Sequence, residues 1–75
     1  MSNENFGVVL LTLNVVMDRQ DISIYKMSKL SSIKYDVVAN YYYNRIHIYN
    51  ADILAKFCSI LNCPLSSIIT YKSSL

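Results

Sequence analysis

Glycine and proline are almost absent from this chain: Gly7 and Pro64 are the only examples among its 75 residues. These residue types are the strongest local breakers of helices and strands, so their scarcity leaves little room for linkers or long loops. In addition, 53% of the residues are hydrophobic, which is too many for a disordered chain. We therefore expect a folded chain, made mostly of helices that are joined by tight turns.

The length of the chain allows one domain, which we place at residues 1–75. Cys58 and Cys63 have neither the spacing nor the histidine neighbours of a zinc site, so we expect reduced core residues. The apolar run from Val8 to Val16 is too short to span a bilayer and lacks the preceding cation of a signal peptide. A cytoplasmic protein is the resulting expectation.

The charge of the chain is small overall but unevenly distributed. Seven Lys and Arg residues against five Asp and Glu residues give a net charge of +2, which is compatible with many partners. Residues 26–45 contain a single acid, Asp36, and carry a charge of +3 from four cations, namely Lys26, Lys29, Lys34 and Arg45. The basic character of the chain is therefore concentrated in this segment.

The N-terminal half contains an apolar run and two short helical patterns. Residues 6–11, FGVVLL, fit a buried strand, although periodicity alone does not separate that from the start of a helix. Thr12 is a candidate N-cap for a helix that ends near Gln20, with Leu13, Val16 and Met17 at helical spacing. Ser23 is a candidate cap for a second helix that ends near Ser31, with apolar residues three apart at Ile24, Met27 and Leu30.

A third helix is predicted from about Lys34 to Tyr43, after a connection of only a few residues. Its inward face is expected to carry Val37, Val38 and Tyr41, and its outward face Tyr35, Asp36, Asn40 and Tyr43. Residues 44–49 then form a loop or an extended segment. Asn50 caps the most regular helix, residues 51–62, whose apolar stripe consists of Ile53, Leu54, Phe57, Ile60 and Leu61.

Pro64 is expected to open a short final helix that runs through Ile69. The segment ITYK that follows can extend and pair with VVLL near the N-terminus, since each is a lone strand that needs a partner. The predicted fold class is therefore all-α, with five helices and possible pairing of the terminal segments into a two-stranded ribbon. Whether these strands pair within one chain or between two chains stays open at this point.

Two segments carry a resemblance to a known family. DISIYKMSKLSSIKYDVVANYYYNR has a capped helix, the small residue Ser28 in its middle, a short turn opened by Ser32, the apolar Ile33, and Val38 inside the next helix. ADILAKFCSILNCPLSSIITY has an amphipathic helix, then LN, then a short helix. Both segments resemble the Cro/cI-type (XRE-like) helix-turn-helix family of phage and bacterial repressors. This resemblance implies a five-helix domain, similar to that of lambda repressor, that binds double-stranded DNA.

Two positions depart from the family pattern. Ser32 stands where a glycine usually adopts a left-handed conformation at the turn, which costs roughly 1 kcal/mol for another residue. Asn44 replaces a second glycine after the third helix, and asparagine tolerates that conformation better than most residues. Both departures are compatible with the family's fold.

The resemblance implies that the third helix contacts base edges in the major groove. The matching positions in this chain are Lys34, Tyr35, Asp36 and Asn40. Asn40 can pair with adenine, Asp36 can accept a hydrogen bond from cytosine, and Tyr35 can contact a base edge or a thymine methyl. For Asp36 there are two alternatives. It can pair with Lys34, or it can have a purely structural role in the first helical turn, where an acidic side chain stabilises the helix through the macrodipole.

Phosphate contacts are expected from the start of the second helix and from the loop after the third, at Tyr25, Lys26, Tyr43, Asn44 and Arg45. Tyr42 is a further candidate, although tyrosines at a helix end are as often packing groups. A subunit with only three or four cations directed at phosphates would bind DNA weakly as a monomer, so we expect a homodimer. Its interface would use FGVVLL or IITYKSSL.

No catalytic arrangement is recognisable, so we expect no enzyme, no cofactor, no metal, no membrane contact and no small-molecule ligand. His47 is the single histidine, and the one glycine excludes a glycine-rich phosphate loop. The predicted function is a transcription regulator, in the first place a repressor, from a phage or a bacterium. The alternative is a helix-turn-helix fold reused as a protein-interaction module, because aromatic residues are enriched at protein interfaces.

Overall fold

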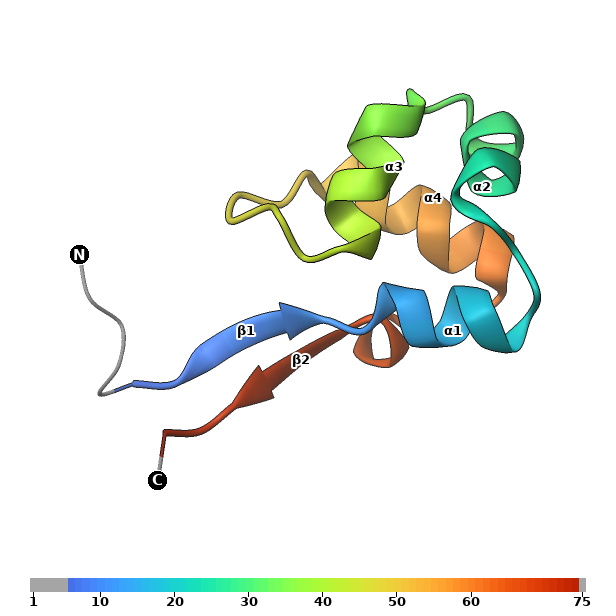
Figure 1. Cartoon of the computed structure of the whole chain (residues 1–75). Helices are drawn as coiled ribbons and strands as arrows, with labels where there is room; N and C mark the ends of the chain where they lie inside the picture. Colours follow the sequence, from blue (N-terminus) through green and yellow to red (C-terminus); the bar gives the residue numbers. More distant parts are fainter. Residues whose placement is uncertain (1–5, 75) are drawn as a thin grey trace.

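The computed structural model describes residues 6–74, which form four α-helices, one turn of 3-10 helix and a two-stranded sheet (Figure 1). In the figure α2, α3 and α4 lie together, α1 lies against them, and the two strands extend away from the helices as a ribbon. The elements are, in chain order, β1 (Val8–Leu11), α1 (Leu13–Arg19), α2 (Ile24–Ser31), α3 (Tyr35–Tyr42), α4 (Ala51–Leu61), the 3-10 turn η1 (Leu65–Ser67) and β2 (Ile69–Lys72).

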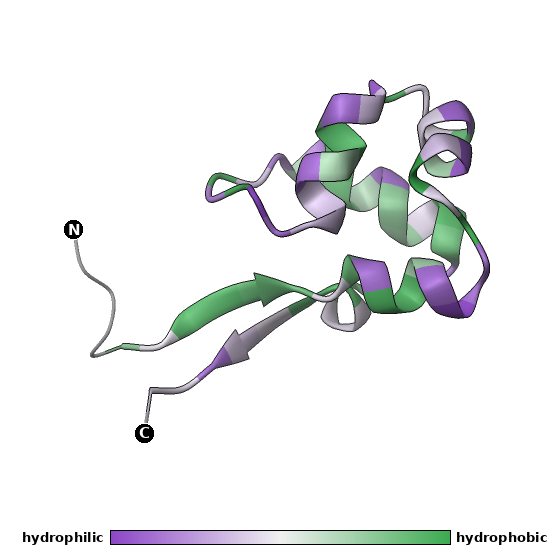
Figure 2. Cartoon of the chain, viewed as in Figure 1, coloured by the Kyte–Doolittle hydropathy of each residue, from purple (hydrophilic) through white to green (hydrophobic). Residues whose placement is uncertain are grey.

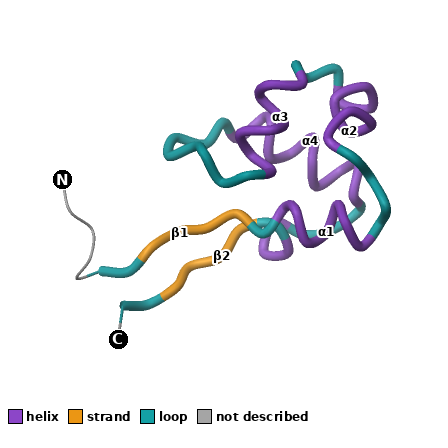
Figure 3. Tube along the Cα trace, viewed as in Figure 1, coloured by secondary structure: helices purple, strands orange, loops and turns teal. Residues whose placement is uncertain are grey.

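The expectation of five helices is wrong, because the segment after Pro64 forms one 3-10 turn (Figure 3). The backbone N–H groups of Ser67 and Ile68 donate to the carbonyls three residues earlier, on Pro64 and Leu65. The turn cannot continue as a helix because Ile69 already belongs to β2. Pairing with β1 therefore overrides the helical tendency of this short segment.

The terminal strands pair with each other within the chain, which resolves the question that the sequence left open. β1 and β2 are antiparallel, with Val8 opposite Lys72 and Leu11 opposite Ile69. Thr12 adds to this junction, since its hydroxyl donates to the carbonyl of Ser67 at 2.8 Å. Thr12 occupies the N-cap position of α1 as predicted, but its side chain makes no capping bond there.

The core lies between the four helices and the inner end of the ribbon, and it confirms most of the predicted inward faces. Tyr41 is 1% exposed, packs edge-on against Phe57 with ring centroids 5.4 Å apart, and accepts a hydrogen bond from the backbone of Asn50. The other fully buried large side chains are Leu13, Met17, Met27, Val38, Leu61 and Ile68. Polar residues lie on the outer sides of the helices (Figure 2).

The last apolar residue in the spacing pattern of α2 does not face the core. Leu30 is 53% exposed, and the buried residue of this turn is Ser31. Ser31 lies four residues after Met27, one helical turn further along the same face, whereas Leu30 is rotated away. The Ser31 hydroxyl donates to the carbonyl of Met27 at 2.7 Å, so its burial leaves no polar group without a partner.

Among residues 6–74, four residues other than glycine have positive φ angles, and they close helices or turns in place of the missing glycines. Ser32 ends α2 with φ of 60°, and Asn62 ends α4 with φ of 52°. Asn44 has φ of 61°, and Asp21 has φ of 60°. The left-handed conformations predicted for Ser32 and Asn44 are therefore confirmed. Within residues 6–74, no helix has the length and apolar character needed to cross a membrane.

Candidate nucleic-acid interface

Side-chain hydrogen bonds build the connection between α2 and α3. The Ser23 hydroxyl accepts from the backbone N–H of Lys26 and caps the start of α2, as predicted. At the other end, the hydroxyl of Ser28 donates to the carbonyl of Ile33 at 2.5 Å, and the N–H of Ile33 donates to Ser31. These bonds hold residues 32–34 in a tight turn, so α3 begins at a defined place relative to α2.

The first turn of α3 presents its side chains to solvent. Lys34, Tyr35 and Asp36 are all exposed, and Tyr35 retains 51% of its accessible surface. Asp36 lies in the first helical turn, where its negative charge interacts favourably with the positive end of the helix macrodipole. Among the described residues it has neither an ion pair nor a hydrogen bond through its side chain, so pairing with Lys34 is not observed. These three side chains are free to contact a partner.

Four tyrosines surround one shallow depression on the same side of the molecule. Tyr25 from α2 and Tyr35, Tyr42 and Tyr43 from α3 and its end line a space of about 380 Å³, together with Asp18, Ser23 and Ile24. We call this the tyrosine hollow. Tyr25 and Tyr43 are 63% and 57% exposed, so the hollow offers aromatic surface and hydroxyl groups to a partner.

Tyr42 has a structural contact at the edge of this hollow. Its hydroxyl donates to a carboxylate oxygen of Asp18 at 2.6 Å and thereby joins α3 to the end of α1. This hydrogen bond raises the pKa of Tyr42, because the phenolate would lose the bond and face the negative charge of Asp18. Tyr42 therefore joins two helices, in agreement with the packing alternative that the sequence left open.

Asn40 and Arg45, which were predicted for different kinds of contact, bond to each other. The Arg45 Nε donates to the side-chain oxygen of Asn40 at 3.3 Å, and the guanidinium lies 5.0 Å from the ring centroid of Tyr43. Tyr43 in turn packs edge-on against Tyr42. The amide of Asn40 is thus oriented before any partner arrives, while its nitrogen remains available as a donor.

Lys26, which was predicted to contact phosphate, and Lys29, which belongs to the same basic segment, are both exposed. Lys26 lies in the first turn of α2 and Lys29 lies with its ammonium 5.3 Å from the ring centroid of Tyr25. Tyr25 is therefore flanked by positive charge, which suits a contact with a negatively charged group. Lys56, which was not predicted for the site, donates to the carbonyl of Ser31 at 3.3 Å and supports the end of α2.

Asn44 has a structural contact that the sequence did not predict. Its side-chain oxygen accepts from the N–H of Leu11 at 2.9 Å, and its side-chain nitrogen donates to the carbonyl of Leu11 at 2.7 Å. The amide thus pairs with β1 in the manner of a neighbouring strand. Both polar atoms of its side chain are already bonded, so we propose a structural role for Asn44, and its phosphate contact stays a prediction.

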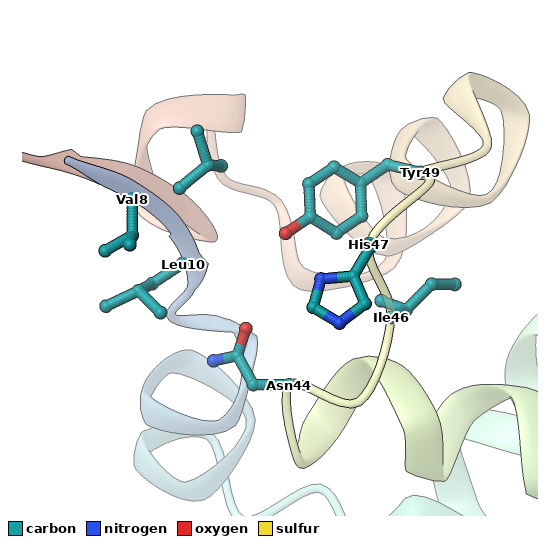
Figure 4. Close-up of a pocket in the computed structure, with 7 residues that line it drawn as sticks. Val8, Leu10, Asn44, Ile46, His47 and Tyr49 are labelled. Atoms are coloured by element: carbon teal, nitrogen blue, oxygen red, sulfur yellow. The ribbon is translucent and has the colours of Figure 1, made fainter. Parts of the chain in front are cut away.

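His47 and the two cysteines lie away from the tyrosine hollow. His47 is exposed on the loop between α3 and α4, beside a groove along β1 (Figure 4). Cys58 and Cys63 are free thiols that are half-buried, and partial burial raises the pKa of Cys63. Residues 6–74 contain no cluster of three or more histidine, cysteine or acidic side chains that could hold a metal ion.

Comparison with known proteins identifies the family of the chain. The sequence profile of the Cro/C1-type HTH DNA-binding domain matches residues 12–74, which is most of the chain. The chain belongs to this family. The recognition made from the sequence is therefore confirmed, and α2, the turn at Ser32 and α3 are the helix-turn-helix of a Cro/C1-type domain.

A solved structure supports the same fold. The crystal structure of a candidate DNA-binding protein from Bacteroides fragilis superimposes with a TM-score of 0.75, covering 84% of this chain and all of that one. The two sequences are 16% identical, so this likeness supports the Cro/C1-type fold alone. A search of curated proteins returned no match.

Proposed function

We propose that this Cro/C1-type domain is a sequence-specific regulator that binds double-stranded DNA, reads the major groove with α3, and acts as a homodimeric repressor. The observation that carries the proposal is the exposed first turn of α3, with Lys34, Tyr35 and Asp36, beside the tyrosine hollow. An α-helix fits the major groove, where each base pair presents a distinct pattern of donors and acceptors. Repression would follow from occupation of the site.

The base contacts would come from four side chains, in agreement with the sequence analysis: Lys34, Tyr35, Asp36 and Asn40. The bond from Arg45 orients the Asn40 amide, so less conformational entropy is lost when the amide meets an adenine. Asp36 has no partner within the described chain, so it remains free to accept from cytosine N4. Tyr35 supplies a hydroxyl and an apolar ring beside them.

The phosphate contacts would come from Tyr25, Lys26, Tyr43 and Arg45, which surround these side chains. Lys29 would add charge behind the ring of Tyr25. Rigid tyrosines contribute contact area and a hydroxyl group at low entropic cost, which offsets the small number of cations. Two subunits on paired half-sites would double the number of contacts, which is the reason for proposing a homodimer.

The first test is selection of bound sequences from random duplexes, followed by binding of variants to the selected site. Asn40→Ala should relax the preference at one base position, with a loss of about 1–3 kcal/mol for the preferred base. Lys26→Ala should weaken binding to all sequences alike. It should also reduce the salt slope, which is the steepness of the fall of log K with log salt concentration, by about 1. Lys26 is a better test of a phosphate contact than Arg45, because substitution of Arg45 would also remove its bond to Asn40.

Lys72→Ala is the matched control, since it removes the same charge from β2, at the end of the ribbon that extends away from the helices (Figure 1). It should leave both the sequence preference and the salt slope unchanged. Absence of binding to any duplex at low ionic strength would refute the proposal. So would equal effects of Lys26→Ala and Lys72→Ala, because binding would then depend on net charge alone.

The alternative function is a protein-interaction module, and the tyrosine hollow is the observation that favours it. Three of its tyrosines are more than half exposed, and tyrosine is enriched in the energetically dominant parts of protein interfaces. Salt distinguishes the two functions. If each subunit neutralises four phosphates, a fourfold rise in salt should weaken its DNA binding roughly 100-fold, whereas an aromatic protein contact should change little.

A further inference from the structure

The outer edge of β1 is unpaired over part of its length. Within residues 6–74, β2 is the one strand that neighbours β1. In an antiparallel sheet the N–H and C=O groups of one residue point to the same side, and successive residues alternate. Both groups of Leu11 point to the outer side, because both bond to Asn44. The N–H and C=O groups of Val9 therefore point to the outer side as well.

Asn44 limits how far this edge is open. Its amide occupies the Leu11 position, so another strand cannot extend past Leu11 without displacing it. Beside the rest of the edge lies a groove of about 690 Å³, bounded on the other side by Ile46, His47 and Tyr49 (Figure 4). Space for an incoming strand is therefore present next to Val9, and Asn44 closes one end of it.

The side chains at this edge are apolar and exposed. Phe6 is 69% exposed, Val8 43% and Val9 48%. β1 is hydrophobic along its length, whereas β2 becomes hydrophilic toward its end (Figure 2). An open, apolar strand edge readily pairs with another chain, and proteins often prevent this with a lysine. β2 has such a residue, Lys72, and β1 has none.

We propose that two copies of this chain pair through the free edge of β1, antiparallel and about a twofold axis beside Val9. The result is a four-stranded sheet in the order β2, β1, β1 of the second copy, β2 of the second copy. This interface rests on the homodimer of the proposed function and specifies how that dimer forms. It is a contact of the terminal ribbon and leaves α3 uncovered.

A second copy suits this edge better than a different protein for two reasons. An antiparallel strand edge is self-complementary, since each Val9 donates to and accepts from the Val9 of the other copy. Residues 6–17 contain no ionisable side chain, so two identical edges approach without like charges facing each other. In this register Val8 lies opposite Leu10 of the second copy, and that leucine covers part of the exposed side chain of Val8.

Val9→Pro tests the interface directly, because proline removes the N–H group that points outward and leaves the bonds from β1 to β2 intact. Val9→Ala is the matched control, since it shortens the side chain and keeps the N–H. Analytical ultracentrifugation of the full chain without DNA, from about 1 μM to 1 mM, should give a dimer dissociation constant that rises at least about tenfold in Val9→Pro. Val9→Ala should change it less.

Hydrogen exchange provides a second measurement that needs no variant. The amide of Val9 should become protected as the protein concentration rises, while the amide of Val8, which faces β2, should be protected at every concentration. A chain that stays monomeric up to 1 mM would overturn the proposal. A dimer in which Val9 stays unprotected, or which Val9→Pro leaves unchanged, would also overturn it.

Failure of the interface and failure of the proposed function give different results. A dimer that behaves as expected in these two measurements but binds no duplex supports the β1 interface and refutes DNA binding. Specific DNA binding by Val9→Pro, with the affinity and stoichiometry of the unaltered chain, refutes the β1 interface and leaves the DNA-binding function supported.

Discussion

Replacement of Asn44 by alanine should destabilise the domain by about 2–4 kcal/mol. The two hydrogen bonds to Leu11, at 2.9 and 2.7 Å, contribute about 0.5–1.5 kcal/mol each, or about 1–3 kcal/mol together. Alanine at φ of 61° adds roughly 1 kcal/mol, because the left-handed conformation is less favourable for it than for asparagine. For a domain of this size the loss corresponds to a fall in Tm of roughly 8 °C or more.

Urea and thermal unfolding, followed by circular dichroism, measure this effect. Asn44→Gly is the matched control, since glycine removes the same two hydrogen bonds but adopts a positive φ without strain. It should be more stable than Asn44→Ala by about 1 kcal/mol. The comparison thus separates the hydrogen bonds from the backbone conformation.

Two results would refute the reasoning. An Asn44→Ala variant within about 0.5 kcal/mol of the unaltered chain would mean that the bonds to Leu11 contribute little. An Asn44→Gly variant less stable than Asn44→Ala would mean that the backbone argument is wrong. A third measurement tests the proposed structural role against the predicted phosphate contact. If the role of Asn44 is structural, folded Asn44→Gly should keep the salt dependence of DNA binding, because its side chain is already bonded to Leu11.

Three further predictions concern other contacts of the fold. Ser32→Gly should stabilise the domain by about 0.5–1 kcal/mol in urea unfolding, because φ of 60° suits glycine; a destabilised variant would contradict this. Gly7→Ala should destabilise it by about 1–3 kcal/mol in thermal unfolding, since the new methyl group would meet the carbonyl of Lys72 at a positive φ; unchanged stability would exclude that clash. The raised pKa of Tyr42 means that its bond to Asp18 stabilises fully below pH 10 and is lost as pH rises through the folded-state pKa. Tyr42→Phe should therefore be less stable than the unaltered chain at pH 7 and should lose less stability above pH 10. If the unfolding free energies of the two proteins change in parallel with pH, the bond to Asp18 makes no such contribution.

The helices and their caps follow from the sequence because the interactions that define them are local. Ser23 and Asn50 cap α2 and α4 as predicted, each by a bond to the N–H three residues ahead. The spacing of Leu13, Val16 and Met17 likewise placed the buried face of α1 correctly. In α2, apolar spacing alone does not identify the buried residue of the last turn, because Leu30 is exposed whereas Ser31 is buried with its hydroxyl bonded inside its own helix.

The arrangement of the candidate site was predictable in part. The sequence and the family resemblance together gave Lys34, Tyr35 and Asp36 as exposed side chains at the start of α3, and the structure agrees. They did not give the bond between Arg45 and Asn40, nor the meeting of Tyr25 with the tyrosines of α3. Such contacts depend on how the helices pack and on where the side chains end. The spacing of residues along one helix does not specify either of these.

The sequence by itself determined where the four α-helices begin, most of the residues that face the core, and the family to which the chain belongs. Only the tertiary structure decided that the segment after Pro64 is a single 3-10 turn, that Tyr42 joins α3 to Asp18, and that Asn44 pairs with β1. The physical reason is distance along the chain. Caps and helical faces depend on residues three or four positions apart, whereas these last two bonds join residues 24 and 33 positions apart, and folding alone brings them together.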